Sequence, residues 1–195
     1  HYFSFRLDLD VDGTSNSLVV DRLKAQSLPE GHPRRSLWVR DPMLARTEAD
    51  AKLNISLDHP ALWRGISSSR TNHVGDPTSY QIMPGKNVNT LLSRDDYPRR
   101  RAGFIDHHLW VTPYRENERY AAGEHPTLST PGQGLPDWVS NDRPIADTDI
   151  VLWHTVGMHH LVRAEDWPVM PVLWHSFEIR PFDFFNRNPA MDVPK

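Results

Sequence analysis

The first twelve residues alternate strictly between two kinds of side chain. His1 and five apolar residues occupy the odd positions, and polar residues occupy the even positions from Tyr2 to Asp12. Because successive side chains of a strand point to opposite faces, this pattern predicts a strand with one buried and one polar face. Asp12-Gly13 is a turn signal, and Ser17-Leu-Val-Val-Asp21 predicts the returning strand.

A second strong signal lies at 150–156, a continuous apolar run typical of a strand that is buried on both faces. The middle of the chain, 29–134, is rich in Pro, Ser, Asn and Asp. Four shorter β-like runs interrupt it, at 51–57, 80–83, 89–92 and 109–114. Helical periodicity does not persist beyond about two turns, so we expect few and short helices. The pattern predicts one all-β domain, a sandwich with long Pro-rich loops.

Composition narrows the possible chemistry. The 195 residues contain no Cys, which excludes a disulfide scaffold, a thiolate metal site and a Cys nucleophile. A net charge of −3 gives no electrostatic reason to expect a nucleic-acid partner. No apolar run of about 18 residues is present, so we expect no membrane span. Eleven His residues are the one excess that bears on chemistry, because imidazole is a common metal ligand.

Three carboxylates precede the predicted turn. Asp8, Asp10, Asp12 and Gly13 resemble the opening of an EF-hand loop, but Val19 stands where that loop needs a Glu, and the segment is predicted to be a strand. An EF-hand is therefore excluded. Asp8 and Asp10 lie on the same face about 7 Å apart, so they bind a hard cation if another segment supplies oxygens. The alternative is a solvated polar face.

Histidines supply the second set of candidate ligands. His1 is either a core residue of the apolar face or a free N-terminal residue whose amine and imidazole chelate copper. His107-His108 and His159-His160 are adjacent pairs, and neighbouring side chains of a strand point to opposite faces. At most one histidine of each pair therefore serves a given metal ion. The residues by themselves predict a β-sandwich with candidate metal sites.

Four segments, in order along the whole chain, resemble the copper amine oxidase family. The first segment resembles the stretch that follows the family's His-x-His copper motif, and His1 takes the place of its second His. The others resemble the next recognisable block, the stretch that carries the third copper His, and the C-terminal tail. The segments are 2–13, 109–123, 149–171 and 180–189.

The resemblance implies two metal sites. His1 and His160 match copper ligands, and Met170 matches a methionine near the copper. The structural calcium site of the family is matched by three side chains and two backbone carbonyls: Asp8, Asp10 and Asp149, with the carbonyls of Leu9 and Ile150.

A further calcium site occurs in some members of the family. Glu48 matches one of its ligands, but Asn141 and Arg143 stand where carboxylates are expected. Because Arg143 would repel a cation, we expect that this second site holds no calcium.

The resemblance also implies an activity. Copper amine oxidases use O2 to convert primary amines to aldehyde, ammonia and hydrogen peroxide, and they act as homodimers. Their topaquinone is made from a Tyr that follows Asn, and both this Tyr and the Asp base precede the copper motif. None of the five Tyr residues here follows Asn. The resemblance therefore implies that residues 1–195 are a C-terminal portion of the catalytic domain, itself a large antiparallel β-sandwich. We expect this portion to need the remainder of the polypeptide and to be inactive alone.

Two other functions remain open. A copper monooxygenase would use a free N-terminal His1, and a non-catalytic β-sandwich assembly module would keep the fold without copper. Asn54-Ile-Ser56 is a glycosylation sequon that matters only in a secreted protein. Secreted, periplasmic and peroxisomal locations all remain compatible with the sequence.

Overall fold

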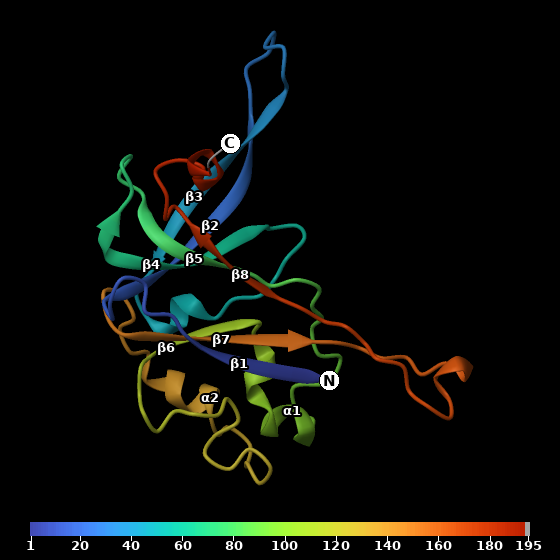
Figure 1. Cartoon of the computed structure of the whole chain (residues 1–195). Helices are drawn as coiled ribbons and strands as arrows, with labels where there is room; N and C mark the ends of the chain where they lie inside the picture. Colours follow the sequence, from blue (N-terminus) through green and yellow to red (C-terminus); the bar gives the residue numbers. More distant parts are fainter. Residues whose placement is uncertain (194–195) are drawn as a thin grey trace.

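The computed structural model describes residues 1–193, so positions 194 and 195 of the predicted domain lie outside the described part. The chain forms two antiparallel sheets, shown in Figure 1. The smaller sheet has the strand order β1-β7-β6, and the larger has the order β3-β2-β4-β5-β8. The strands are β1 (Tyr2–Asp8), β2 (Asn16–Ser27), β3 (Ser36–Ala45), β4 (Ala61–Thr71), β5 (Pro77–Met83), β6 (Leu109–Pro113), β7 (Ile150–Gly157) and β8 (Glu178–Phe182).

The helices are short, as the pattern predicted. Each α-helix begins with a Pro in its first turn, where the missing N–H costs nothing. The helices are α1 (Tyr97–Arg101) and α2 (Leu135–Trp138), with 3-10 turns η1 (Glu48–Ala51), η2 (Gly103–Asp106), η3 (Val139–Asn141), η4 (Ala164–Asp166) and η5 (Pro189–Asp192). Within the described residues, no helix has the length and hydropathy needed to cross a membrane.

The main core lies between the two sheets. Leu18 and Val20 of β2 and Trp63 of β4 pack with apolar residues of the smaller sheet, among them Leu109 and Leu152. A second cluster lies on the other face of the smaller sheet, where α2 and η3 cover the indole rings of β6 and β7. Every residue of β7 is therefore buried, which confirms the prediction of a strand covered on both faces.

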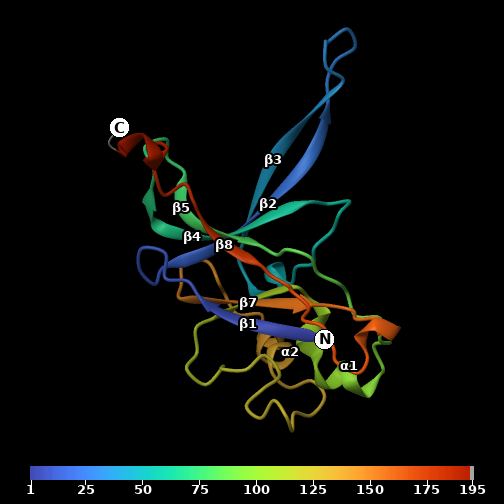
Figure 2. The same cartoon turned by 45° about the vertical axis from the view of Figure 1, so that its right-hand side comes forward.

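The hairpin of β2 and β3 projects beyond the body of the molecule (Figures 1 and 2). Residues 16–21 of β2 are buried in the sandwich, whereas 22–27 are exposed apart from the half-buried Leu23. In β3 the Trp38 side chain is 70% exposed. Pro42 is accommodated because β3 is an edge strand, where one row of backbone groups needs no ladder partner.

Two of the predicted strands are wrong. Residues 48–51 form η1, and in 51–57 only Leu53 makes an isolated bridge, to Leu109. Residues 89–92 form no strand. The predictions at 80–83 and 109–114 are confirmed by β5 and β6. Strands β3, β4 and β8 lie outside the predicted runs because tertiary pairing, rather than a local alternation of apolar residues, stabilises them.

The burial of β1 also departs from its sequence pattern. Phe3 and Phe5 are exposed, whereas the polar Ser4 and Arg6 on the other face are half-buried. The larger sheet leaves this part of β1 uncovered, and Phe5 packs on Phe177 with a ring-centroid distance of 4.8 Å. The expected buried odd face is therefore wrong for the first half of the strand and holds only from Leu7 onward.

Candidate metal sites

The ladder between β1 and β7 has predicted metal ligands near both of its ends. Asp8 pairs with Val151 at one end of the ladder, and Tyr2 pairs with Gly157 at the other. The predicted calcium ligands therefore gather at the first end, and His1 lies at the second. A strand rises about 3.3 Å per residue, so the residues between Tyr2 and Asp8 keep the two ends of the ladder apart.

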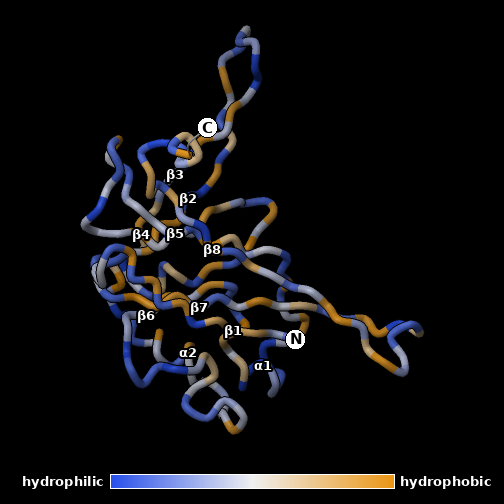
Figure 3. Tube along the Cα trace, in the orientation of Figure 1, coloured by the Kyte–Doolittle hydropathy of each residue, from blue (hydrophilic) through white to orange (hydrophobic). Residues whose placement is uncertain are grey.

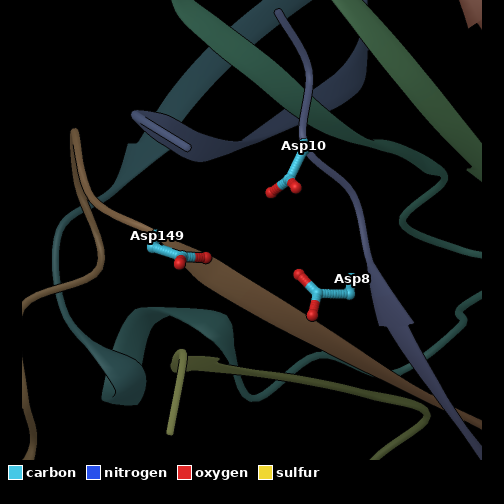
Figure 4. Close-up of side chains that lie close together, drawn as sticks. All are labelled: Asp8, Asp10 and Asp149. Carbon is cyan, nitrogen blue, oxygen red and sulfur yellow. The ribbon is translucent and has the colours of Figure 1, made fainter. Parts of the chain in front are cut away.

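Three carboxylates converge at the first end. One oxygen from each of Asp8, Asp10 and Asp149 lies within 4.8 Å of the others, and Figure 4 shows the three groups turned toward a common space. Asp149 comes directly before β7, and its carbonyl accepts a hydrogen bond of 2.8 Å from the Tyr114 N–H. Arg6 donates to Asp8 at 3.2 Å. The fold thus unites residues that are about 140 positions apart.

The charges at this cluster repel one another. Burial raises the pKa of Asp149, and the nearby carboxylates of Asp8 and Asp10 raise it further, against the opposing charge of Arg6. A divalent cation would relieve this repulsion, and carboxylate oxygens are the ligands that calcium prefers. The donor set therefore fits calcium. The other two predicted ligands are the backbone carbonyls of Leu9 and Ile150. Both residues are immediate neighbours of the carboxylates in the chain.

Asn16 holds the loop that carries Asp10. Its side-chain oxygen accepts from the Val11 N–H at 2.9 Å, and its amide donates to the carbonyls of Val11 and Gly13 at 3.2 and 3.0 Å. Its backbone pairs with Thr148 in both directions, at 2.9 and 3.0 Å. Asn16 therefore ties the loop to the residue that precedes Asp149. Sequence reasoning missed this role, although an Asn just after a turn is a usable signal.

The histidine end of the ladder is also formed by backbone pairing. The nitrogen of His1 donates to the Met158 carbonyl at 2.9 Å, and Met158 donates back to the His1 carbonyl at 2.9 Å. His160 follows two residues later. This pairing places His1 beside the segment that carries His160.

The two histidines of the second pair have different partners. His159 Nε2 lies 3.3 Å from the Tyr2 hydroxyl, whereas His160 Nε2 lies 2.9 Å from the Asp166 carboxylate. The Nδ1 atom of His160 has no hydrogen-bond partner among residues 1–193. An imidazole with one nitrogen bound and the other free suits a copper ligand, so the arrangement of His160 fits copper. Met170 is half exposed in the segment beyond them.

Three further histidines bond to other protein groups rather than gather around a common metal site. His108 Nδ1 accepts from the Ile55 N–H at 3.0 Å, and His154 Nδ1 bonds to the His108 carbonyl at 2.9 Å. His107 bonds to the exposed Asn54 at 3.1 Å, so the side chain of the glycosylation sequon already has a partner. Burial lowers the pKa of His107, His108 and His154, which keeps these rings neutral.

Arg143 occupies one of the ligand positions of the second calcium site that some members of the family have. Its guanidinium donates to Glu48 with a shortest distance of 2.7 Å and to Glu118 with a shortest distance of 2.6 Å. Burial acts to lower the pKa of Arg143, but the two glutamates outweigh it and raise that pKa. Asn141 is exposed. The two carboxylates of Glu48 and Glu118 therefore already surround a fixed positive charge.

Comparison with known proteins decides the family. A family model described as copper amine oxidase, enzyme domain, matches residues 1–195. The chain belongs to the copper amine oxidase family.

Its relatives are longer proteins. A copper-containing amine oxidase, gamma 1, of Arabidopsis thaliana is 42% identical over 193 residues, which cover 98% of this chain and 27% of that protein. A primary amine oxidase of Lens culinaris is 39% identical over 192 residues, covering 98% and 29%. The chain thus spans less than a third of the length of these relatives.

Solved structures of copper amine oxidases have the same fold. The crystal structure of a copper-containing benzylamine oxidase from Hansenula polymorpha superposes with a TM-score of 0.89 at 34% identity, covering 100% of this chain and 31% of that one. An Aspergillus nidulans amine oxidase has a TM-score of 0.84 at 20% identity, a likeness of fold alone. The prediction of an antiparallel β fold of the copper amine oxidase type is confirmed.

Proposed function

We propose that this chain is a C-terminal portion of the catalytic domain of a primary-amine oxidase. The whole enzyme would use O2 to convert small primary amines to aldehyde, ammonia and hydrogen peroxide. The observation that carries the proposal is the β1–β7 ladder, which has a carboxylate cluster at one end and His1 beside the His160 segment at the other. Family membership supports the same function.

His1 and His160 would hold copper, together with at least one ligand from outside the chain. Copper supplies redox chemistry with dioxygen when it is bound. The chain's own contribution would be to bring the segment that carries His160 beside His1, through the backbone pairing of His1 with Met158. Met170 would lie near the metal. The topaquinone and the catalytic base would come from the remainder of the polypeptide, so residues 1–195 would not turn over alone.

The carboxylate cluster would hold a structural calcium ion. Asp8, Asp10 and Asp149, with the carbonyls of Leu9 and Ile150, would bind it. The ion would join the end of β1 to the start of β7, the same ladder that carries His1. Calcium would therefore stabilise the strand pair rather than take part in the reaction.

A second copy of the protein would complete the assembly as a homodimer. The projecting β2–β3 hairpin exposes Leu37 and Trp38, and an isolated two-stranded hairpin has little stability of its own in water. A partner surface that covers these side chains would supply the missing burial. The hairpin thus supports the dimer.

The test uses the complete polypeptide that carries this chain. Wild-type protein is expected to contain copper and to release peroxide from a primary amine, measured with a peroxidase-coupled assay. His160→Ala should lose copper and activity, whereas His159→Ala should retain copper because that ring bonds to Tyr2 instead. A wild-type protein without copper or turnover would contradict the proposal and favour the assembly module.

A further inference from the structure

A buried carboxylate contacts the proposed copper ligand His160. Asp166 is 1% exposed and lies in η4, six residues after that histidine. Its Oδ2 atom lies 2.9 Å from His160 Nε2 and accepts from the Arg163 N–H at 3.0 Å. Its Oδ1 atom accepts from the Arg163 guanidinium at 2.9 Å. The carboxylate thus bonds to a backbone group, a cation and the imidazole.

This contact determines which ring nitrogen of His160 is free. An ionised carboxylate only accepts hydrogen bonds, so the Nε2 atom beside Asp166 must carry the ring proton. In the neutral imidazole, Nδ1 then presents a lone pair. The Nδ1 atom has no hydrogen-bond partner among the described residues, so it is available to a metal.

We propose that Asp166 is a positioning residue that fixes the tautomer and the ring orientation of His160, so that Nδ1 binds the copper. The inference rests on the proposed function. Carboxylates that bond to the outer nitrogen of a metal-binding histidine orient the ring and raise its basicity, and losing one typically costs 10–100-fold in metal affinity. We expect a loss of this size in copper affinity when the carboxylate is removed.

Asp166 also has a structural role, because it accepts from the Arg163 backbone. A control variant separates this role from the contact with His160. In η1, the exposed Asp50 holds the same position in the turn, and its Oδ2 atom accepts from the Arg46 and Thr47 N–H groups at 2.9 and 3.3 Å. It has no histidine partner among the described residues. Asp50→Asn therefore reports the cost of weakening a similar backbone contact without changing a metal ligand.

The experiment compares Asp166→Asn with Asp50→Asn in the complete polypeptide. Asn can keep an oxygen at the place of Oδ2, the atom that accepts from the Arg163 N–H and contacts His160 Nε2, so folding should be retained. It removes the negative charge that raises the basicity of the ring, and this charge is what the variant tests. Copper affinity is measured by competition with a chelator, and the copper environment is measured by electron paramagnetic resonance. We expect Asp166→Asn to weaken copper binding 10–100-fold and to change the spectrum, and we expect Asp50→Asn to do neither.

The outcomes separate the two proposals. If wild-type protein binds no copper, the proposed function fails. If wild-type protein binds copper and Asp166→Asn binds it with the same affinity and spectrum, only the role of Asp166 is overturned. Equal losses in Asp166→Asn and Asp50→Asn would also overturn it, because they would reveal a general loss of stability. Partial recovery of affinity in Asp166→Glu would support the role.

Discussion

The Arg143 guanidinium lies 2.7 Å from the carboxylate of Glu48, a side chain with no solvent exposure. Glu48 belongs to η1 and Arg143 follows η3, so the pair joins segments 95 positions apart. Glu118 binds the same guanidinium at 2.6 Å from a third segment. One cation therefore pairs with two buried carboxylates, and a calcium ion at this place would have to displace it.

Replacing Arg143 should strongly destabilise the protein. Arg143→Met leaves Glu48 and Glu118 as buried charges without a cation, and breaking a buried pair in this way costs about 3–5 kcal/mol. The free energy of unfolding, measured with urea, checks this value. Arg119→Met is the control, because Arg119 forms an exposed pair with Glu116 at 3.6 Å. Similar losses in the two variants would contradict the importance of burial.

Calcium should stabilise the protein through the carboxylate cluster. At a free concentration 100 times its Kd, a ligand that binds only the folded state adds about 2.7 kcal/mol. We expect calcium to raise the thermal midpoint of wild-type protein and a chelator to reverse the rise. Asp149→Asn should abolish the response, whereas the exposed Asp95→Asn should preserve it. A calcium response that survives in Asp149→Asn would refute the assignment of this residue.

Stability should decrease when the pH falls below neutrality, in part because of His154. This ring is fully buried between Trp63 and Phe177, near His108, and burial lowers its pKa. Below the unfolded pKa of about 6.5, the unfolded chain binds a proton that the folded chain does not. Stability is therefore fully present above that pH and is lost as the pH falls toward the lower folded pKa.

The size of this effect is measurable by urea unfolding at several pH values. One such histidine contributes a slope of up to about 1.4 kcal/mol per pH unit. His154→Asn keeps a donor for the His108 carbonyl but cannot titrate, so the slope between pH 7 and 5.5 should become shallower by up to this amount. An unchanged slope in His154→Asn would show that this ring does not contribute.

The projecting hairpin should determine the oligomeric state. Trp38→Asp places a charge at a side chain that is 70% exposed, so it should leave the protomer folded. If the hairpin packs on a second copy, the buried charge should shift the protein from dimer to monomer in analytical ultracentrifugation. Arg35→Asp is the control, because it also introduces an Asp, at the residue directly before β3. A dimer that Trp38→Asp does not weaken would place the interface elsewhere.

The sequence by itself determined the local elements with the clearest patterns. Alternation at 1–12 predicted β1, and the continuous apolar run at 150–156 predicted β7, because period and composition follow from how a strand exposes its two faces. The resemblance also named Asp8, Asp10 and Asp149 together, and the fold brings their carboxylates within 4.8 Å of one another.

Only the tertiary structure decided which groups meet. The exposure of Phe3, the two glutamates around Arg143 and the contact of Asp166 with His160 all depend on which distant segment covers each residue. A local pattern records the tendency of a side chain to be buried but not its partner. Partners are determined by the path of the whole chain, since burying a charge or a ring is favourable only where a complementary group lies within reach.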